Sequence, residues 1–315
     1  MSSGFGEGEW ALILGGSSGF GLATAQKLAE NGMNLLIVHR DRRGAMRAIE
    51  PEFEKLRGLG VEMHTWNADA ISDEKRAGLL DEMKDVLGAT GRVRVLLHSI
   101  AFGNLKLIAP EKPQARTAGP ALAAKLGVDA QALVAAAGEL VGEGEDGLHS
   151  VAAAPEYPSH GLLDEDDFAR TILSMGTSLL GWTQGLFQRE LFAADARIFG
   201  LTSEGNTLAW KGYAAVSAAK VSLEALVRSI AVEFGPYGIR CNVIQAGVTD
   251  TPALRAIPGN EALVAQARLR NPGGRLTEPR DVANVIYLLS LDEARWINGS
   301  LIRVDGGEHV SGVTR

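Results

Sequence analysis

The sequence predicts a doubly wound α/β fold, in which one parallel sheet of seven strands carries helices on both faces. Two observations lead to this fold class. Short apolar runs alternate with helical patterns along most of the chain, and a glycine cluster separates the first apolar run from the first helix. Parallel strands require crossover connections, whose helices pack back on the sheet and bury both of its faces. We therefore expect residues 1–315 to form a single domain.

The expected strands are short apolar runs, of which WALIL at 10–14 is the first and NLLIV at 34–38 the second. The others lie at 61–66, 93–98, 196–201, 239–244 and 300–304. The helices lie at 22–31, 44–59, 73–87, 166–192 and 279–291, with one more that carries Tyr213 and Lys220. Cys241, within the sixth strand, is expected to be a small core residue.

Residues 104–164 interrupt this alternation. They are rich in Ala, Gly and Pro, with two short helical patterns at 120–126 and 129–140, and they far exceed the few residues that usually join a strand to a helix. The segment follows the carboxyl end of a strand, and ligands of doubly wound sheets bind beyond those ends. We interpret this insertion as a lid on the substrate side. A disordered segment and an oligomer contact are the alternatives.

Composition narrows the classes of function. The formal net charge of −7 and the pI near 5.5 disfavour a nucleic-acid-binding protein, because phosphate contacts need clustered Lys and Arg. The one cysteine excludes an internal disulfide, and the six histidines show no zinc-like spacing. We find no targeting segment and no apolar run of about 18 residues. We therefore expect a cytoplasmic protein with no metal and no membrane partner.

The first strand-to-helix turn is rich in glycine. Glycines let the backbone approach a pyrophosphate, and the next helix offers free N–H groups and the positive end of its dipole. A tight turn without a ligand is the alternative, but the place of this turn favours a dinucleotide site. The expected cofactor contacts here are Gly15, Ser17, Ser18, Gly19, Phe20 and Gly21.

Charged residues follow the second and third strands. A free ribose 2′-hydroxyl usually meets Asp or Glu after the second strand, whereas this chain has Arg40 there and Arg42 close by. Cations suit a 2′-phosphate, so we expect NADPH, with NADH as the second option; a solvated charge run is the alternative. Asp69, followed by Ala70, is placed to accept a hydrogen bond from the adenine amino group.

The stretch GYAAVSAAK at 212–220 places a tyrosine and a lysine seven positions apart among small residues. On a helix of about 100° per residue, such side chains share one face, about 10 Å apart along the axis. Tyr213 and Lys220 can therefore act on one bound molecule. A surface pair on an amphipathic helix would show the same spacing.

Together these motifs resemble the short-chain dehydrogenase/reductase superfamily. The resemblance extends over nearly the whole chain outside the insertion and includes the glycine turn, the Tyr/Lys helix, QAGVTDT at 245–251 and VDGG at 304–307. It implies a Rossmann-type fold, a nicotinamide cofactor and a homotetramer. Further implied cofactor contacts are Ser99, Ile100, Ala101, Gly247, Thr251, Lys220 on the nicotinamide ribose, and Val248 near the carboxamide.

Within that superfamily, the chain is most similar to the enoyl-acyl carrier protein reductases. The large ketoreductase branch has its tyrosine four positions before the lysine, where this chain has Val216, and a relay asparagine where our alignment has Met175. HSIAF at 98–102 is similar to an enoyl-reductase segment, and the C-terminal third is most similar to the NADPH-using variant. Ser203, seventeen residues before Lys220, is a further catalytic candidate that does not separate the branches.

The resemblance implies reduction of the C2=C3 double bond of a trans-2-enoyl thioester, in fatty acid synthesis or related acyl metabolism. Tyr213 would stabilise the enolate oxygen, and an always cationic Lys220 would hold the cofactor ribose. Residues 252–271 would form a substrate flap, in which Leu254 and Ile257, together with Phe102, contact the acyl chain. An amphipathic helix packed on the core is the alternative for the flap.

Three arginines, Arg268, Arg270 and Arg275, are a candidate basic patch for an acidic acyl carrier protein, with a solvated face as the alternative. Two other functions stay open. One is NADPH-dependent reduction of a ketone or ketoacyl substrate by the same superfamily. The other is a non-catalytic nucleotide-binding sensor, which has no need of the Tyr213 phenol.

Overall fold

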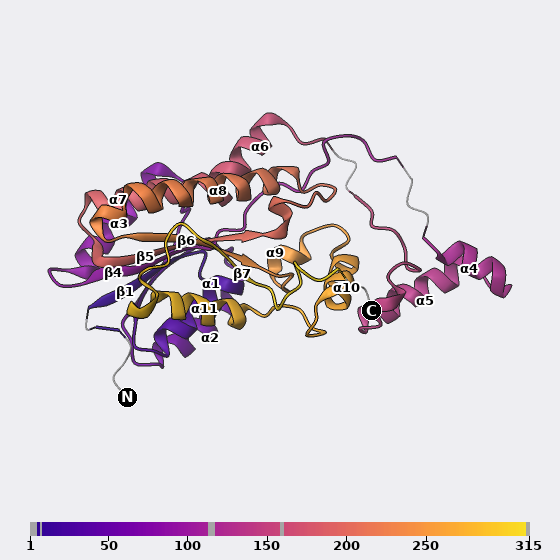
Figure 1. Ribbon diagram of the computed structural model, residues 1–315, viewed down its shortest axis with the longest axis horizontal. Coiled ribbons are helices and arrows are strands. Elements are labelled where there is room, and N and C mark those ends of the chain that lie inside the picture. Colours follow the sequence, from indigo (N-terminus) through magenta and orange to yellow (C-terminus); the bar gives the residue numbers. More distant parts are fainter. Residues whose placement is uncertain (1–4, 7, 113–116, 158–160, 313–315) are drawn as a thin grey trace.

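The computed structural model describes residues 5–6, 8–112, 117–157 and 161–312. Within these residues, one sheet of seven parallel strands has the order β3-β2-β1-β4-β5-β6-β7, which confirms the doubly wound fold (Figure 1). The strands are β1 (Glu9–Leu14), β2 (Asn34–His39), β3 (Met63–Asn67), β4 (Arg92–His98), β5 (Phe192–Ser203), β6 (Arg240–Ala246) and β7 (Leu301–Val304). The order reverses between β1 and β4, which is where such sheets bind ligands at their carboxyl ends.

Helices cover both faces of the sheet (Figure 1). One face carries α3 (Asp73–Leu87), α7 (Ser178–Gln188) and α8 (Ala214–Glu233), and the other carries α1 (Gly19–Ala29), α2 (Met46–Arg57) and α11 (Pro279–Ser290). Along β1, Leu12 packs with the first group and Ile13 with the second, and neither is exposed. Burial on both sides explains why the strands read as nearly continuous apolar runs. Cys241 is buried in β6, as expected.

The structure divides the helix expected at 166–192. Helix α6 (Glu165–Ile172) passes into a π-helical segment at Leu173–Thr177 and then into α7, which ends at Gln188, so Phe192 already belongs to β5. A Cβ on Gly176 would lie 2.7 Å from the Ala219 carbonyl oxygen. The π segment therefore brings its backbone directly against α8, beside the predicted catalytic residues.

The insertion forms two helices close to the expected patterns, α4 (Gly119–Leu126) and α5 (Ala130–Gly142), followed by the 3-10 turn η1 (Asp146–Leu148). The expected flap forms α9 (Pro252–Arg255) and α10 (Asn260–Arg270). Figure 1 shows α4 and α5 beyond the carboxyl ends of the strands, on the side where α10 lies. The remaining 3-10 turns are η3 (Glu204–Asn206), η4 (Gly235–Tyr237) and η5 (Asp292–Ala294).

Candidate active site

Three predicted catalytic side chains meet at the carboxyl end of β5. Ser203 is the last residue of β5, and the Tyr213 hydroxyl lies 3.5 Å from Ser203 Oγ. Lys220 Nζ donates a hydrogen bond of 2.8 Å to the carbonyl oxygen of Leu201, in the same strand. Tyr213 is the N-cap of α8, not a residue within the helix, because the chain turns at Gly212, whose φ is +73°.

Burial sets the protonation states of this group. It raises the pKa of Tyr213, and the hydrogen bond with Ser203 offsets only part of that rise. The phenol therefore keeps its proton at neutral pH and can donate it in a hydrogen bond. Burial also lowers the pKa of Lys220 to about 8, against an opposite effect of Glu224. Lys220 is therefore mostly cationic at neutral pH, as expected, but it loses its charge as the pH rises through about 8, because desolvation disfavours the ammonium.

A buried histidine, for which the sequence predicted no role of its own, lies next to this group. His98, the last residue of β4, is 1% exposed, and its Nε2 lies 2.8 Å from Ser178 Oγ. Burial, and then the charge of Lys220, lowers the pKa of His98 to about 3, so the imidazole is neutral. A histidine that ends an apolar strand gives no spacing signal, which is why the sequence did not single it out.

The glycine turn leaves no room for side chains. A Cβ on Gly15, whose φ is +87°, would lie 2.5 Å from the Ser99 carbonyl oxygen, and a Cβ on Gly21 would lie 2.1 Å from the Gly15 carbonyl oxygen. The turn is therefore packed against residues 99–100, so two of the expected cofactor segments lie side by side. Ile100, in the second of these segments, also packs against the core on the α8 side of the sheet.

The start of α1 is open to an anion. Ser17 and Ser18 precede the helix, Gly19 and Phe20 begin it, and the side chain of the N-cap residue Ser18 makes no capping hydrogen bond. The first N–H groups of a helix have no partner within it, so they suit a pyrophosphate. A Cβ on Gly19 would lie 3.5 Å from Thr251 Cγ2, which places Thr251 at the same spot. The described residues thus fit a dinucleotide here.

Arg40 lies where a ribose 2′-phosphate would bind, but its guanidinium already contacts other side chains of the protein. Its Nη1 lies 3.2 Å from Asp69 Oδ2, and its guanidinium lies 4.4 Å from the centroid of the Phe102 ring. Asp69 also accepts a hydrogen bond from the Ile71 N–H. The Ala70 carbonyl oxygen accepts one from Trp182 Nε1. Phe102, expected at the substrate, thus contacts the cation expected at the cofactor.

In the loop after β6, a side chain of the protein already occupies the backbone N–H of one expected cofactor contact. The Val248 N–H, expected near the nicotinamide carboxamide, donates a hydrogen bond of 3.1 Å to Glu308 Oε2. A Cβ on Gly247 would lie 2.8 Å from that same oxygen. Glu308 therefore covers the amide of Val248. It was missed because it lies 60 positions away in the sequence.

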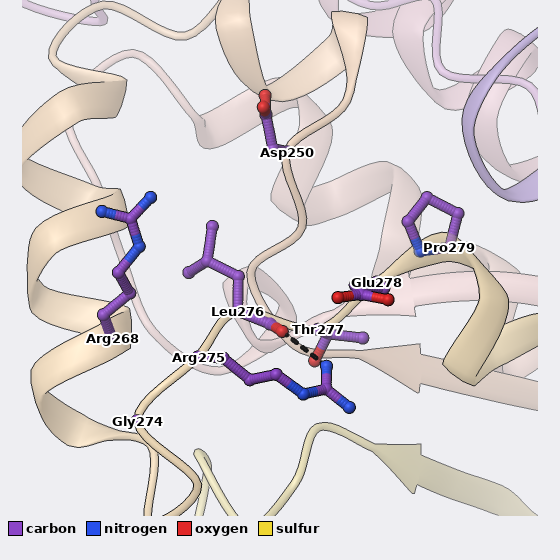
Figure 2. A pocket seen from close by; sticks show the side chains of 8 residues that line it. All are labelled: Asp250, Arg268, Gly274, Arg275, Leu276, Thr277, Glu278 and Pro279. Carbon is purple, nitrogen blue, oxygen red and sulfur yellow. Dashed lines mark hydrogen bonds between the residues drawn. The ribbon is translucent and has the colours of Figure 1, made fainter. Parts of the chain in front are cut away.

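The flap borders this loop. Thr251 Oγ1 accepts a hydrogen bond from the N–H of Leu254, which is 8% exposed, and Ile257 follows α9. A surface pocket of about 290 Å³ opens between Asp250, α10 and the loop before α11. Figure 2 shows Asp250 and Arg268 on different walls of this pocket. The pocket is lined by Asp250, Arg268, Gly274, Arg275, Leu276, Thr277, Glu278 and Pro279.

The expected basic patch is not a free surface. Arg268 pairs with Asp146 of the insertion, Arg270 pairs with Glu204 and Glu308, and Arg275 pairs with Asp281. Each guanidinium thus has a carboxylate partner within the protein. Neutralised in this way, the three arginines offer little attraction to an acidic carrier.

The insertion contacts both sides of the crevice. On the flap side, Arg268 Nη1 lies 3.1 Å from Asp146 Oδ1, and a Cβ on Gly259 would lie 2.5 Å from Pro155. On the other side, the ring of Tyr157 in the insertion contacts Lys211, which lies two residues before Tyr213. Lys211 Nζ lies 5.6 Å from the centroid of this ring. Residues 155–157 therefore reach from the expected flap to the loop before Tyr213.

Among the described residues, no group of three or more His, Cys, Asp or Glu side chains is placed to hold a metal ion. No helix in the described part of the chain combines the length and the apolar character that crossing a membrane requires.

Comparisons with known proteins agree with this geometry. The family model of the enoyl-(acyl carrier protein) reductases matches residues 125–309, and the short chain dehydrogenase model matches residues 9–118. The chain is 26% identical to a cis-4-hydroxycyclohexanecarboxylate dehydrogenase of Sinomonas cyclohexanicum, over 94% of this chain and 95% of that protein. It is 28% identical to a probable 2,4-dienoyl-CoA reductase of Bacillus subtilis, with the same coverage of 94% and 95%.

A solved structure shares the fold. The NADH enoyl-[acyl-carrier-protein] reductase of Aquifex aeolicus superposes with a TM-score of 0.70 at 21% identity, over 98% of each chain. The family model that covers 125–309 spans more than half of the sequence. The chain therefore belongs to the short-chain dehydrogenase/reductase superfamily, and its larger C-terminal part follows the enoyl-(acyl carrier protein) reductase family model.

Proposed function

We propose that the protein reduces the C2=C3 double bond of a trans-2-enoyl thioester with NADPH. The observation that carries this proposal is the position of the phenol. Tyr213 stands ahead of α8, three residues before Val216, which is buried against Met175. The donor thus lies further along the crevice than a tyrosine at 216 would. This suits an oxygen that is two carbons away from the carbon that accepts hydride.

Each residue has a role in this reaction. When bound, NADPH would supply the hydride that the β-carbon, C3, accepts, and a proton taken up from water would complete the reduction at C2. The Tyr213 hydroxyl donates a hydrogen bond to the thioester oxygen, where negative charge develops. Ser203 orients the phenol. Lys220, held by the Leu201 carbonyl oxygen, binds the ribose hydroxyls. Leu254 and Ile257 of the flap, together with Phe102, contact the acyl chain, which is carried by CoA or by a carrier protein.

Reduction of a ketone or a ketoacyl substrate is the second candidate. Ser203 lies within reach of Tyr213, as a serine that assists carbonyl reduction would. The Sinomonas cyclohexanicum relative is named as a dehydrogenase of a hydroxy compound, whereas the Bacillus subtilis relative is named as a dienoyl-CoA reductase. A nucleotide-binding sensor without catalysis is the third candidate.

We also propose a homotetramer. Large apolar side chains on the outer surfaces of α7 and α8 support it: Leu180 is 36% exposed, Val221 47% and Val232 76%. Sedimentation equilibrium measures the mass of the assembly directly, and a mass of one chain would exclude the tetramer.

Tyr213→Phe removes the hydroxyl and keeps the ring. We expect kcat for NADPH oxidation with a crotonyl thioester to fall about 10²–10³-fold, because the enolate loses its donor. NADPH affinity, measured by fluorescence titration, should not change. Tyr237→Phe is the matched control, since Tyr237 is 60% exposed.

The same assay separates the candidates. Wild-type protein that turns over an acetoacetyl thioester and not the crotonyl thioester would refute enoyl reduction. If Tyr213→Phe kept full biological activity, the sensor would be the correct function.

Arg40→Ala tests the choice of cofactor. Charge-assisted hydrogen bonds to a phosphate contribute about 1.5–3 kcal/mol, so we expect NADPH binding to weaken about 10- to 100-fold. NADH binding should change by less than about threefold, because NADH has no 2′-phosphate. Arg57→Ala, on the outer surface of α2, is the control. Equal weakening of both cofactors would contradict a 2′-phosphate contact.

The lowered pKa of Lys220 predicts that NADPH binding depends on pH. Its pKa of about 8 lies below the usual value of 10.5, so the ammonium is present below pH 8 and is lost as the pH rises through 8. We expect the Kd for NADPH to rise about tenfold between pH 7 and pH 9, as the protonated fraction falls by about that factor. Lys220→Met should bind weakly with no slope over this range. The same slope in Lys220→Met would place the titrating group elsewhere.

We further propose that the insertion caps the substrate crevice, since residues 155–157 reach both the flap and the loop before Tyr213. Tyr157→Ala removes the contact with Lys211, so we expect the KM for the crotonyl thioester to rise about tenfold, a loss of about 1.4 kcal/mol. NADPH affinity should stay the same. Leu126→Ala, at the end of α4 and 60% exposed, is the control. An unchanged KM in Tyr157→Ala would remove the cap.

A further inference from the structure

Three charged side chains from distant parts of the sequence form an ion-pair cluster beside the catalytic group. Nη2 of Arg270, the last residue of α10, donates to an oxygen of Glu204 and, at 2.8 Å, to Oε1 of Glu308. Glu204 directly follows Ser203, and Glu308 follows the VDGG segment after β7. The cluster therefore joins the flap to the end of β5 and to the segment after β7.

Glu308 extends the cluster to the loop after β6. While Oε1 binds Arg270, Oε2 accepts the N–H of Val248. The backbone at Gly247 approaches so closely that a Cβ would lie 2.4 Å from Thr277 Oγ1 and 2.8 Å from Glu308 Oε2. A shift of Glu308 would therefore displace the loop that carries the expected cofactor contacts Gly247 and Val248.

Both carboxylates depend on one guanidinium. Glu204 is 7% exposed and Glu308 is 1% exposed. Burial raises the pKa of Glu308, and the hydrogen bond from Arg270 acts in the opposite direction. The two carboxylates also repel each other, and His309 Nδ1 is 4.0 Å from Glu204 Oε2. Without Arg270, two buried carboxylates would face each other with no guanidinium between them, which favours their separation.

The contact uses one nitrogen of the arginine. Both carboxylates meet at Nη2, whereas Nε is buried and has no hydrogen-bond partner among the described residues. A lysine ammonium can replace a single-nitrogen contact of this kind, although it cannot replace a bidentate one.

We propose that Arg270 is a positioning residue that fixes the C-terminal end of the flap, residues 252–271, to the strand end that carries Ser203 and to the loop that carries Val248. It acts through Glu204 and Glu308 and does not touch the reacting atoms. The flap then keeps one distance from the phenol when an acyl chain enters. This inference rests on the proposed role of 252–271 as the substrate flap.

The test compares Arg270→Met, Arg270→Lys and the double variant Glu204→Gln/Glu308→Gln in the full-length protein. We expect hydrogen exchange in 252–271 to become at least about tenfold faster in Arg270→Met and in the double variant, with exchange in β1 and β4 unchanged. Arg270→Lys should restore exchange to within about threefold of the wild type. Arg275→Met, whose partner is Asp281, is the matched control and should not change it.

Kinetics with the crotonyl thioester supply the second measurement. We expect Arg270→Met to raise KM at least about tenfold and to change kcat less than about threefold, since a loose flap weakens binding before chemistry. Unchanged exchange in 252–271, or faster exchange throughout the sheet, would overturn the inference. Hydrogen exchange does not depend on the substrate. A flap released in Arg270→Met, in a protein that does not reduce crotonyl thioester, would therefore support the inference and refute only the proposed function.

Discussion

The close contact of backbone with backbone at the glycine turn is the constraint on which the crevice depends. Gly15 meets the Ser99 carbonyl oxygen, and Gly21 meets the Gly15 carbonyl oxygen, at distances that exclude any side chain. This contact places the start of α1 directly beside the segment after β4. The free N–H groups of the helix, the residues at 99–101 and Thr251 can then face one ligand. The crevice can therefore form only because Gly15 and Gly21 have no side chains.

Burial sets the protonation states of the proposed catalytic group. The same desolvation that raises the pKa of Tyr213 lowers that of Lys220 and that of His98. The phenol is held as a donor, the imidazole is held neutral, and the lysine is the group whose charge changes closest to neutral pH. Spacing in the sequence cannot reveal this, because pKa shifts follow from the surroundings of a side chain and not from its neighbours in the chain.

The predictable parts of the structure are those that local pattern determines. Short strand patterns predicted the seven strands, and in the centre of the sheet burial on both faces makes these patterns apolar. Turn chemistry predicted a cofactor site at the glycine turn, which stays a prediction. The helix at 166–192 was predicted as continuous because its apolar pattern hides the π segment at Leu173–Thr177. The arginines of the flap were read as a patch, because their partners lie far away: Glu204 is 66 positions from Arg270, and Asp146 is 122 positions from Arg268. Ion pairs over such separations leave no periodic signal.

Those same distant pairs hold the proposed flap through contacts other than those of the proposed catalytic side chains. The Tyr213 phenol and the glycine turn lie at the starts of helices, Lys220 lies within α8, and the packed sheet holds both helices rigidly. The flap is held from outside the sheet, by Asp146 and Pro155 of the insertion at one side and by Glu204 and Glu308 at the other. Changes in those attachments can alter what enters the crevice while leaving the reacting groups in place. A shared fold with relatives of different named activities is what such a division would produce.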